Sequence, residues 1–138
     1  MTTRVSPELT AAVKERAVGR CEYRHAPRIL IGQTFHIDHI LPRALGGTTA
    51  SKNLCYVCAH CNIAKGSRAM ARDPRTQRNV KLFNPRTDEW EEHFRWSGDW
   101  KRVIGRIPLG RATVTRLDMN AHVLRLARPY WRIMGLIP

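Results

Sequence analysis

Acidic residues are scarce in this sequence. Only 11 Asp and Glu stand against 24 Lys and Arg in 138 residues, which gives a formal net charge of +13. So large an imbalance indicates a polyanionic partner, with nucleic acid as the first candidate. Because basic ribosomal and membrane-surface proteins reach similar charge, the charge alone does not choose between these classes, and the motifs must decide.

Long apolar runs are also missing. Residues 1–7 hold no run of the kind that a secretory signal needs, and no segment approaches the roughly 20 apolar residues of a membrane span. We therefore expect a cytoplasmic protein with no membrane partner. Thiols stay reduced in that compartment, so the cysteines at positions 21, 55, 58 and 61 raise the question of metal binding rather than of a disulfide framework.

A chain of 138 residues has room for one compact core with an annex. Ser6 and Pro7 favour the start of a helix over residues 7–18. Residues 34–41 and 54–57 read as strands with a Gly-containing loop between them, and a helix of two or three turns is expected from Ala59. The C-terminal part predicts helices over residues 110–117 and 121–134, the second containing Pro129.

Most of the chemistry-bearing side chains lie between residues 35 and 66. The pair Asp38-His39 lies near the end of the first expected strand, and Gly46 and Gly47 follow in the loop. Asn53 precedes the second strand, and Cys58-Ala59-His60-Cys61-Asn62 leads into the helix. An imidazole can activate water, and carboxylate or amide oxygens can hold a hard divalent cation, so the set suits phosphodiester hydrolysis.

This combined pattern resembles the HNH endonuclease family. In that family a ββα-metal module carries an Asp-His pair on its first strand, a Gly-containing loop, an Asn before the second strand and an Asn or His on the helix. The resemblance implies an α+β fold: a ββα-metal (His-Me finger) core with an N-terminal helix and a helical C-terminal extension. We expect residues 1–82 to form the nuclease core and residues 83–138 to form an extension packed on it.

The resemblance also implies a metal-dependent endonuclease acting on DNA, with double-stranded DNA as the expected substrate. Asp38 and Asn62 would be oxygen ligands to one Mg²⁺ or Mn²⁺ ion, and His39 would be the general base. Asn53, counted with His39 among the catalytic residues, would brace the loop or orient the His39 ring. Neighbouring strand residues start toward opposite faces, so we expect a bend or bulge at Asp38 and His39.

Whether the cysteines bind a second metal ion is left open by the sequence. Cys58 and Cys61 form a knuckle of the kind that binds structural zinc, and many zinc-bearing HNH proteins pair it with an earlier Cys-x-x-Cys. Here Cys21 is followed by Arg24 where the partner cysteine would stand. Three alternatives remain: His25 completes a Zn²⁺ site with Cys21, Cys58 and Cys61; Cys55 moves in from the second strand; or zinc is lost, with Arg24 in the site and the thiols packed as small apolar groups.

Basic residues crowd the region after Asp38, where Asp73 is the single acid before Leu82. Such residues bind phosphates without sequence choice, and we expect DNA contacts from Arg43, Lys65, Arg68 and Arg72. A rival from another class is a zinc-knuckle protein that binds nucleic acid without cutting it. That reading accounts for the charge and the cysteines, but not for Asp38, His39 and Asn62 together.

Overall fold

The computed structural model describes residues 5–31 and 34–137. The chain divides into two compact units, Met1–Ala69 and Met70–Pro138, each of which has helices and short antiparallel strands, so the α+β class is confirmed. Residues 70–82, which the sequence assigned to the core, belong to the second unit. None of the helices in the described part of the chain has the length and apolar character needed to cross a bilayer.

The first unit begins with α1 (Pro7–Arg16), as the sequence predicted. The side-chain oxygen of Ser6 accepts a hydrogen bond from the amide of Leu9 at 3.1 Å, and Pro7 occupies the first turn. An N-cap of this kind satisfies a donor that the helix leaves unpaired. The helix contacts β2 and buries Val13 there. A short helix, α2 (Arg28–Ile31), begins directly after Pro27.

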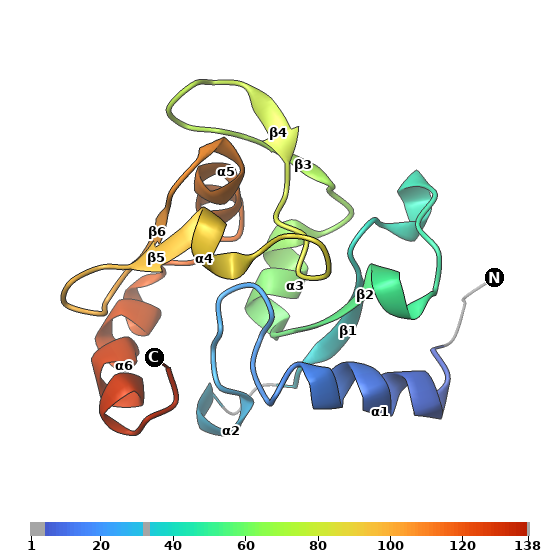
Figure 1. Cartoon of the computed structure of the whole chain (residues 1–138), viewed down its shortest axis with the longest axis horizontal. Coiled ribbons are helices and arrows are strands. Elements are labelled where there is room, and N and C mark those ends of the chain that lie inside the picture. The colour runs from blue at the N-terminus through green and yellow to red at the C-terminus, as the bar shows by residue number, and fades with distance from the viewer. Residues whose placement is uncertain (1–4, 32–33, 138) are drawn as a thin grey trace. The chain divides into compact units, whose positions relative to one another are not determined.

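The centre of the first unit is the expected strand, loop, strand and helix. Strand β1 (His36–His39) pairs antiparallel with β2 (Leu54–Val57), and α3 (Ala59–Lys65) packs against β1 (Figure 1). Two 3₁₀ turns, Arg43–Leu45 and Ser51–Asn53, shape the loop between the strands. This is the ββα arrangement that the sequence predicted, with a shorter first strand than expected.

The expected bulge at Asp38 and His39 is wrong. Asp38 pairs with Cys55 and His39 with Leu54, in the same register as the two preceding pairs, so none of the four residues of β1 is left over. Regular alternation sends the two side chains to different neighbours. The contact of the His39 ring with Thr49 comes from the loop after β1, and not from a bend in the strand.

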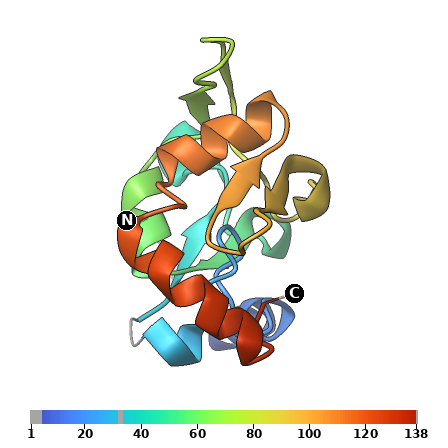
Figure 2. The same ribbon diagram turned by 90° about the vertical axis from the view of Figure 1, so that its left-hand side faces the viewer.

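The second unit is built around α5 (Pro108–Arg116). This helix contacts the hairpin of β3 (Met70–Arg72) and β4 (Asn79–Lys81), and also β6 (Val103–Gly105), which pairs with β5 (Phe94–Trp96). In Figure 2 the orange helix α5 lies beside both strand pairs. A Cβ on Gly110 would lie 1.9 Å from the backbone oxygen of His93, at the end of α4 (Trp90–His93), so only glycine permits this close packing.

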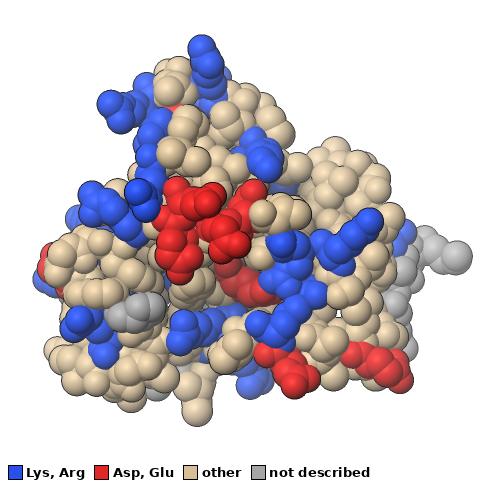
Figure 3. Space-filling model, viewed as in Figure 1, with Lys and Arg blue, Asp and Glu red and all other residues tan. Residues whose placement is uncertain are grey.

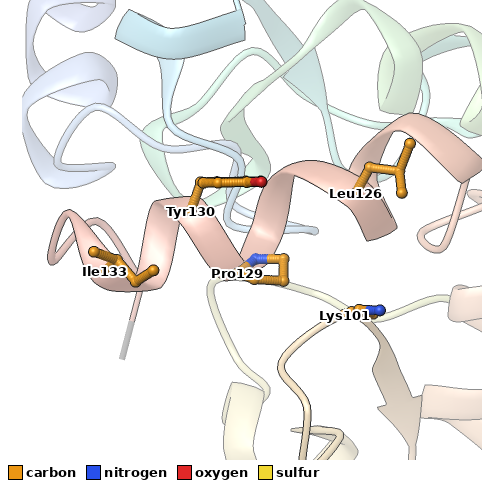
Figure 4. A pocket seen from close by; sticks show the side chains of 5 residues that line it. All are labelled: Lys101, Leu126, Pro129, Tyr130 and Ile133. Carbon is orange, nitrogen blue, oxygen red and sulfur yellow. The ribbon is translucent and has the colours of Figure 1, made fainter.

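The second unit ends in α6 (His122–Ile133), which continues through Pro129. Pro129 therefore does not end the helix. Leu124 and Trp131 are buried on one side. Leu126, Pro129, Tyr130 and Ile133 line an apolar groove of about 570 Å³ together with Lys101 (Figure 4).

Candidate active site

His39 lies at the end of β1, where the loop folds back over its ring. Its Nε2 lies 2.9 Å from the hydroxyl oxygen of Thr49, and that same oxygen accepts a hydrogen bond from the guanidinium of Arg43 at 3.1 Å. The ring is therefore oriented by a side chain from the middle of the loop. Sequence reasoning missed Thr49, because one threonine in a Gly- and Thr-containing loop carries no signal of which side chain it will meet.

The surroundings of His39 favour its neutral form. Partial burial lowers the pKa of its imidazole, and the positive charges of Arg43 and Lys65 lower it further, while the neighbouring Asp38 carboxylate opposes the shift. A neutral imidazole has one ring nitrogen free to accept a proton. The protonation state is thus the one that a general base requires.

Asp38 forms a buried ion pair with Lys65 of α3. The Lys65 ammonium lies 2.8 Å from Oδ2 of Asp38 and donates to the backbone oxygen of His39 at 3.0 Å. Lys65 is only 1% exposed, whereas the Asp38 side chain keeps 16% of its surface open. The expected contact of Lys65 with DNA is corrected here, because a side chain enclosed between α3 and β1 has no free ammonium to offer a phosphate.

Asn62 lies on α3 one turn before Lys65. Side chains three residues apart share a helix face, so Asn62 belongs to the side of α3 that carries Lys65 toward β1. It is half-buried, and its backbone oxygen accepts from Gly66. This placement is compatible with the expectation that Asn62 and Asp38 contribute oxygen ligands to one ion.

Asn53 braces the loop. Its side-chain oxygen accepts from the amide of Leu41 at 2.8 Å, and its amide nitrogen donates to the backbone oxygens of Leu41 and Thr48 at 3.0 and 2.8 Å. Of the two roles considered for Asn53, these contacts match loop bracing. Asn53 thus holds the backbone of the loop that carries Thr49.

A second cluster of polar side chains brings three cysteines together. The sulfur atoms of Cys21, Cys58 and Cys61 all lie within 4.8 Å of one another, and all three side chains are buried. Glu22 brings Cys21 here: its amide donates to the backbone oxygen of Tyr56, and its carboxylate accepts from the Tyr56 amide at 2.8 Å. Three buried thiols so close together could hold a zinc ion.

Within the cluster the thiols differ in acidity. Hydrogen bonds from Cys21 and Cys61, helped by the charge of Arg24, lower the pKa of Cys58. Burial raises the pKa of Cys21, and the interactions with Cys21 and Cys58 raise that of Cys61.

Neither of the proposed fourth ligands joins this cluster. Among the described residues the metal-ligating group contains Cys21, Cys58 and Cys61 alone. Cys55 points elsewhere: its sulfur contacts the Tyr23 hydroxyl at 3.9 Å and the backbone oxygen of Asp38 at 3.8 Å. The largely buried imidazole of His25 has its pKa lowered to about 4 by desolvation and by the charge of Arg20.

The other expected DNA contacts are exposed. Arg43 and Arg68 are exposed in the first unit, and Arg72 is exposed on the β3–β4 hairpin of the second. Figure 3 shows basic side chains over this hairpin, whose exposed basic residues are Arg72, Arg75, Arg78 and Lys81. Asp73, the one acid of this stretch, is buried and paired with Arg111 at 2.9 Å, so it does not offset the charge on the surface.

Comparison with known proteins gives one match. Residues 31–77 match a protein-family model described as HNH endonuclease. The matched segment holds β1, β2 and α3 with Asp38, His39, Asn53 and Asn62. No curated protein and no solved structure matches the chain.

Proposed function

We propose that this chain, whose residues 31–77 match a protein-family model described as HNH endonuclease, is a metal-dependent endonuclease that hydrolyses phosphodiester bonds in double-stranded DNA. The observation that carries the proposal is the environment of His39. Its ring is oriented through Nε2 by Thr49, and the pKa of its imidazole is lowered. The same sequence motif holds the Asp38 carboxylate on β1 and the Asn62 amide on α3.

His39 is the proposed general base. The Thr49 oxygen accepts from Arg43 and has a second lone pair with which to accept from Nε2–H of His39. That tautomer leaves Nδ1 without a proton, ready to take one from a water molecule that attacks phosphorus. When Nδ1 is protonated, Nε2–H still donates to Thr49, so the ring keeps its orientation through the step.

Asp38 and Asn62 are the proposed ligands of the catalytic ion. Carboxylate and amide oxygens are the donors that Mg²⁺ and Mn²⁺ prefer, and Asp38 already has a cation, the Lys65 ammonium, against one of its oxygens. Lys65 occupies Oδ2 and fixes the carboxylate, and the partial exposure of the Asp38 side chain leaves its other oxygen to take an ion. When bound, the ion would neutralise charge on the phosphate and on the leaving oxygen.

DNA would be held by exposed basic side chains. Arg43, Arg68 and Arg72 are the proposed phosphate contacts, supported by their exposure. Arg43 has a second role in this scheme, because it also donates to Thr49. Contacts of this kind give affinity that falls steeply with salt and does not depend on base sequence.

Cleavage of supercoiled plasmid in Mg²⁺ or Mn²⁺ tests the proposal, with chelator as the blank. His39→Ala should abolish cleavage and leave DNA binding unchanged. His36→Ala, which removes an exposed histidine from the same strand, is the matched control and should cut like the parent. A parent protein that binds plasmid but never cuts it would refute the enzyme and favour the zinc-knuckle binding protein.

A further inference from the structure

The cysteine cluster is one ligand short of a structural zinc site. Structural zinc in proteins is held by four ligands from Cys, His or carboxylate side chains. The described part of the chain gathers three thiols, from Cys21, Cys58 and Cys61, with no fourth group of this kind among them. The open question is what occupies the fourth direction.

The spacing of the residues indicates that Arg24 occupies the position of the fourth ligand. Cys21 and Arg24 are separated by two residues, as are Cys58 and Cys61, so Arg24 stands at the fourth place of the paired knuckles. Its side chain is only 4% exposed and interacts electrostatically with Cys58. Its Nε is buried with no hydrogen-bond partner among the described residues.

A guanidinium at this place opposes zinc. It has five N–H donors and no lone pair, and it stays protonated, so it cannot coordinate a metal. It also puts a positive charge beside the place where a divalent cation would sit, in a buried region where that repulsion is weakly screened. The same charge compensates the sulfur atoms that zinc would otherwise compensate.

The other ligands cannot easily take its place. Cys55 faces Tyr23 and the backbone of Asp38 from the β1–β2 pair, and β-sheet register fixes it there. His25 lies in a turn with a φ of 58°, in which its amide donates to the backbone oxygen of Cys21. Its ring nitrogens are not among the ligand atoms that gather in the cluster.

We propose that Arg24 has replaced the fourth zinc ligand, so that its guanidinium supplies the positive charge of the cluster and the first unit folds without zinc at this site. The cluster is then a metal-free remnant of a paired zinc knuckle. A single substitution that returns a thiol to position 24 restores the tetrahedral ligand set. The inference concerns folding and metal content and stands apart from the proposed cleavage activity.

Zinc content of purified protein tests this inference. Parent, Arg24→Cys and the double variant Arg24→Cys with Cys58→Ser are produced in zinc-supplemented medium, dialysed against a weak chelator and analysed for metal. The expected result is about one equivalent of zinc in Arg24→Cys and less than about 0.1 in the other two. EDTA should lower the thermal midpoint of Arg24→Cys alone.

Two results would overturn the inference. One equivalent of zinc in the parent does so, and His25→Ala then tells whether the imidazole is the fourth ligand. Zinc-free Arg24→Cys that is folded, judged by the far-UV circular dichroism of the parent, also does so, because position 24 would not face the cluster. If Arg24→Cys does not fold, cobalt titration of the parent decides: a tetrahedral thiolate spectrum refutes the inference, and its absence supports it.

Discussion

Replacing Lys65 with methionine should destabilise the first unit by about 3 kcal/mol. The variant keeps most of the aliphatic stem but removes the ammonium that lies 2.8 Å from the Asp38 carboxylate and 3.0 Å from the backbone oxygen of His39. Removing one partner of a buried ion pair costs roughly 3–5 kcal/mol, and an orphaned buried carbonyl adds about 1–3. Since Asp38 is 16% exposed, water recovers part of this cost, which places the expected value at the low end.

Amide hydrogen exchange of β1 and β2 is the suitable assay. All four tryptophans belong to the second unit, so their fluorescence does not report on this site. A loss of about 3 kcal/mol corresponds to an increase of about 100-fold in the exchange rate of amides that open with the unit. The matched control is Lys52→Met, which removes an exposed lysine of the loop and should change exchange by less than about threefold.

The same variant distinguishes two roles for Lys65. If Lys65 were a phosphate contact, the variant would keep its exchange rates and lose DNA affinity, with a salt dependence reduced by about one ion. That pair of results would refute the buried ion pair. If Asp38 also binds the catalytic ion, Mg²⁺ should slow exchange more in the variant than in the parent, because the ion would supply the charge that the ammonium no longer supplies.

Three further predictions concern the loop and the second unit. Gly47→Ala should cost at least about 2 kcal/mol in an unfolding titration followed by circular dichroism, because its Cβ would lie 1.7 Å from the backbone oxygen of Leu41; an unchanged midpoint would contradict this packing. Thr49→Val should lower kcat about tenfold at unchanged KM, with Thr49→Ser restoring it; equal rates in all three proteins would remove Thr49 from the site. Arg111 lowers the pKa of Asp73, so the stability from this carboxylate is present above about pH 4 and lost as pH falls through the lowered value. The thermal midpoint by tryptophan fluorescence should therefore drop on acidification in the parent, and Asp73→Asn should be less stable at pH 7 and less sensitive to acid.

Local sequence was enough to predict the ββα segment. Residue types and the Gly-containing loop predicted β1, β2 and the start of α3, and Ser6 with Pro7 predicted the start of α1. These features depend on backbone preferences and on neighbours a few residues away, which a sequence displays directly. The residue types at the candidate site followed from the same motif.

What the sequence could not decide was which distant side chains would meet. The sequence predicted that Lys65 contacts DNA, and only the packing of α3 on β1 reveals that it is enclosed against Asp38. Thr49 becomes the partner of His39 because Asn53 fastens the loop backbone, a set of contacts with no local signature. Composition, motif and local periodicity determined the resemblance to HNH endonucleases and the elements of the ββα segment. Tertiary structure alone determined burial and long-range pairing, because both depend on how residues far apart in the chain share space in the folded unit.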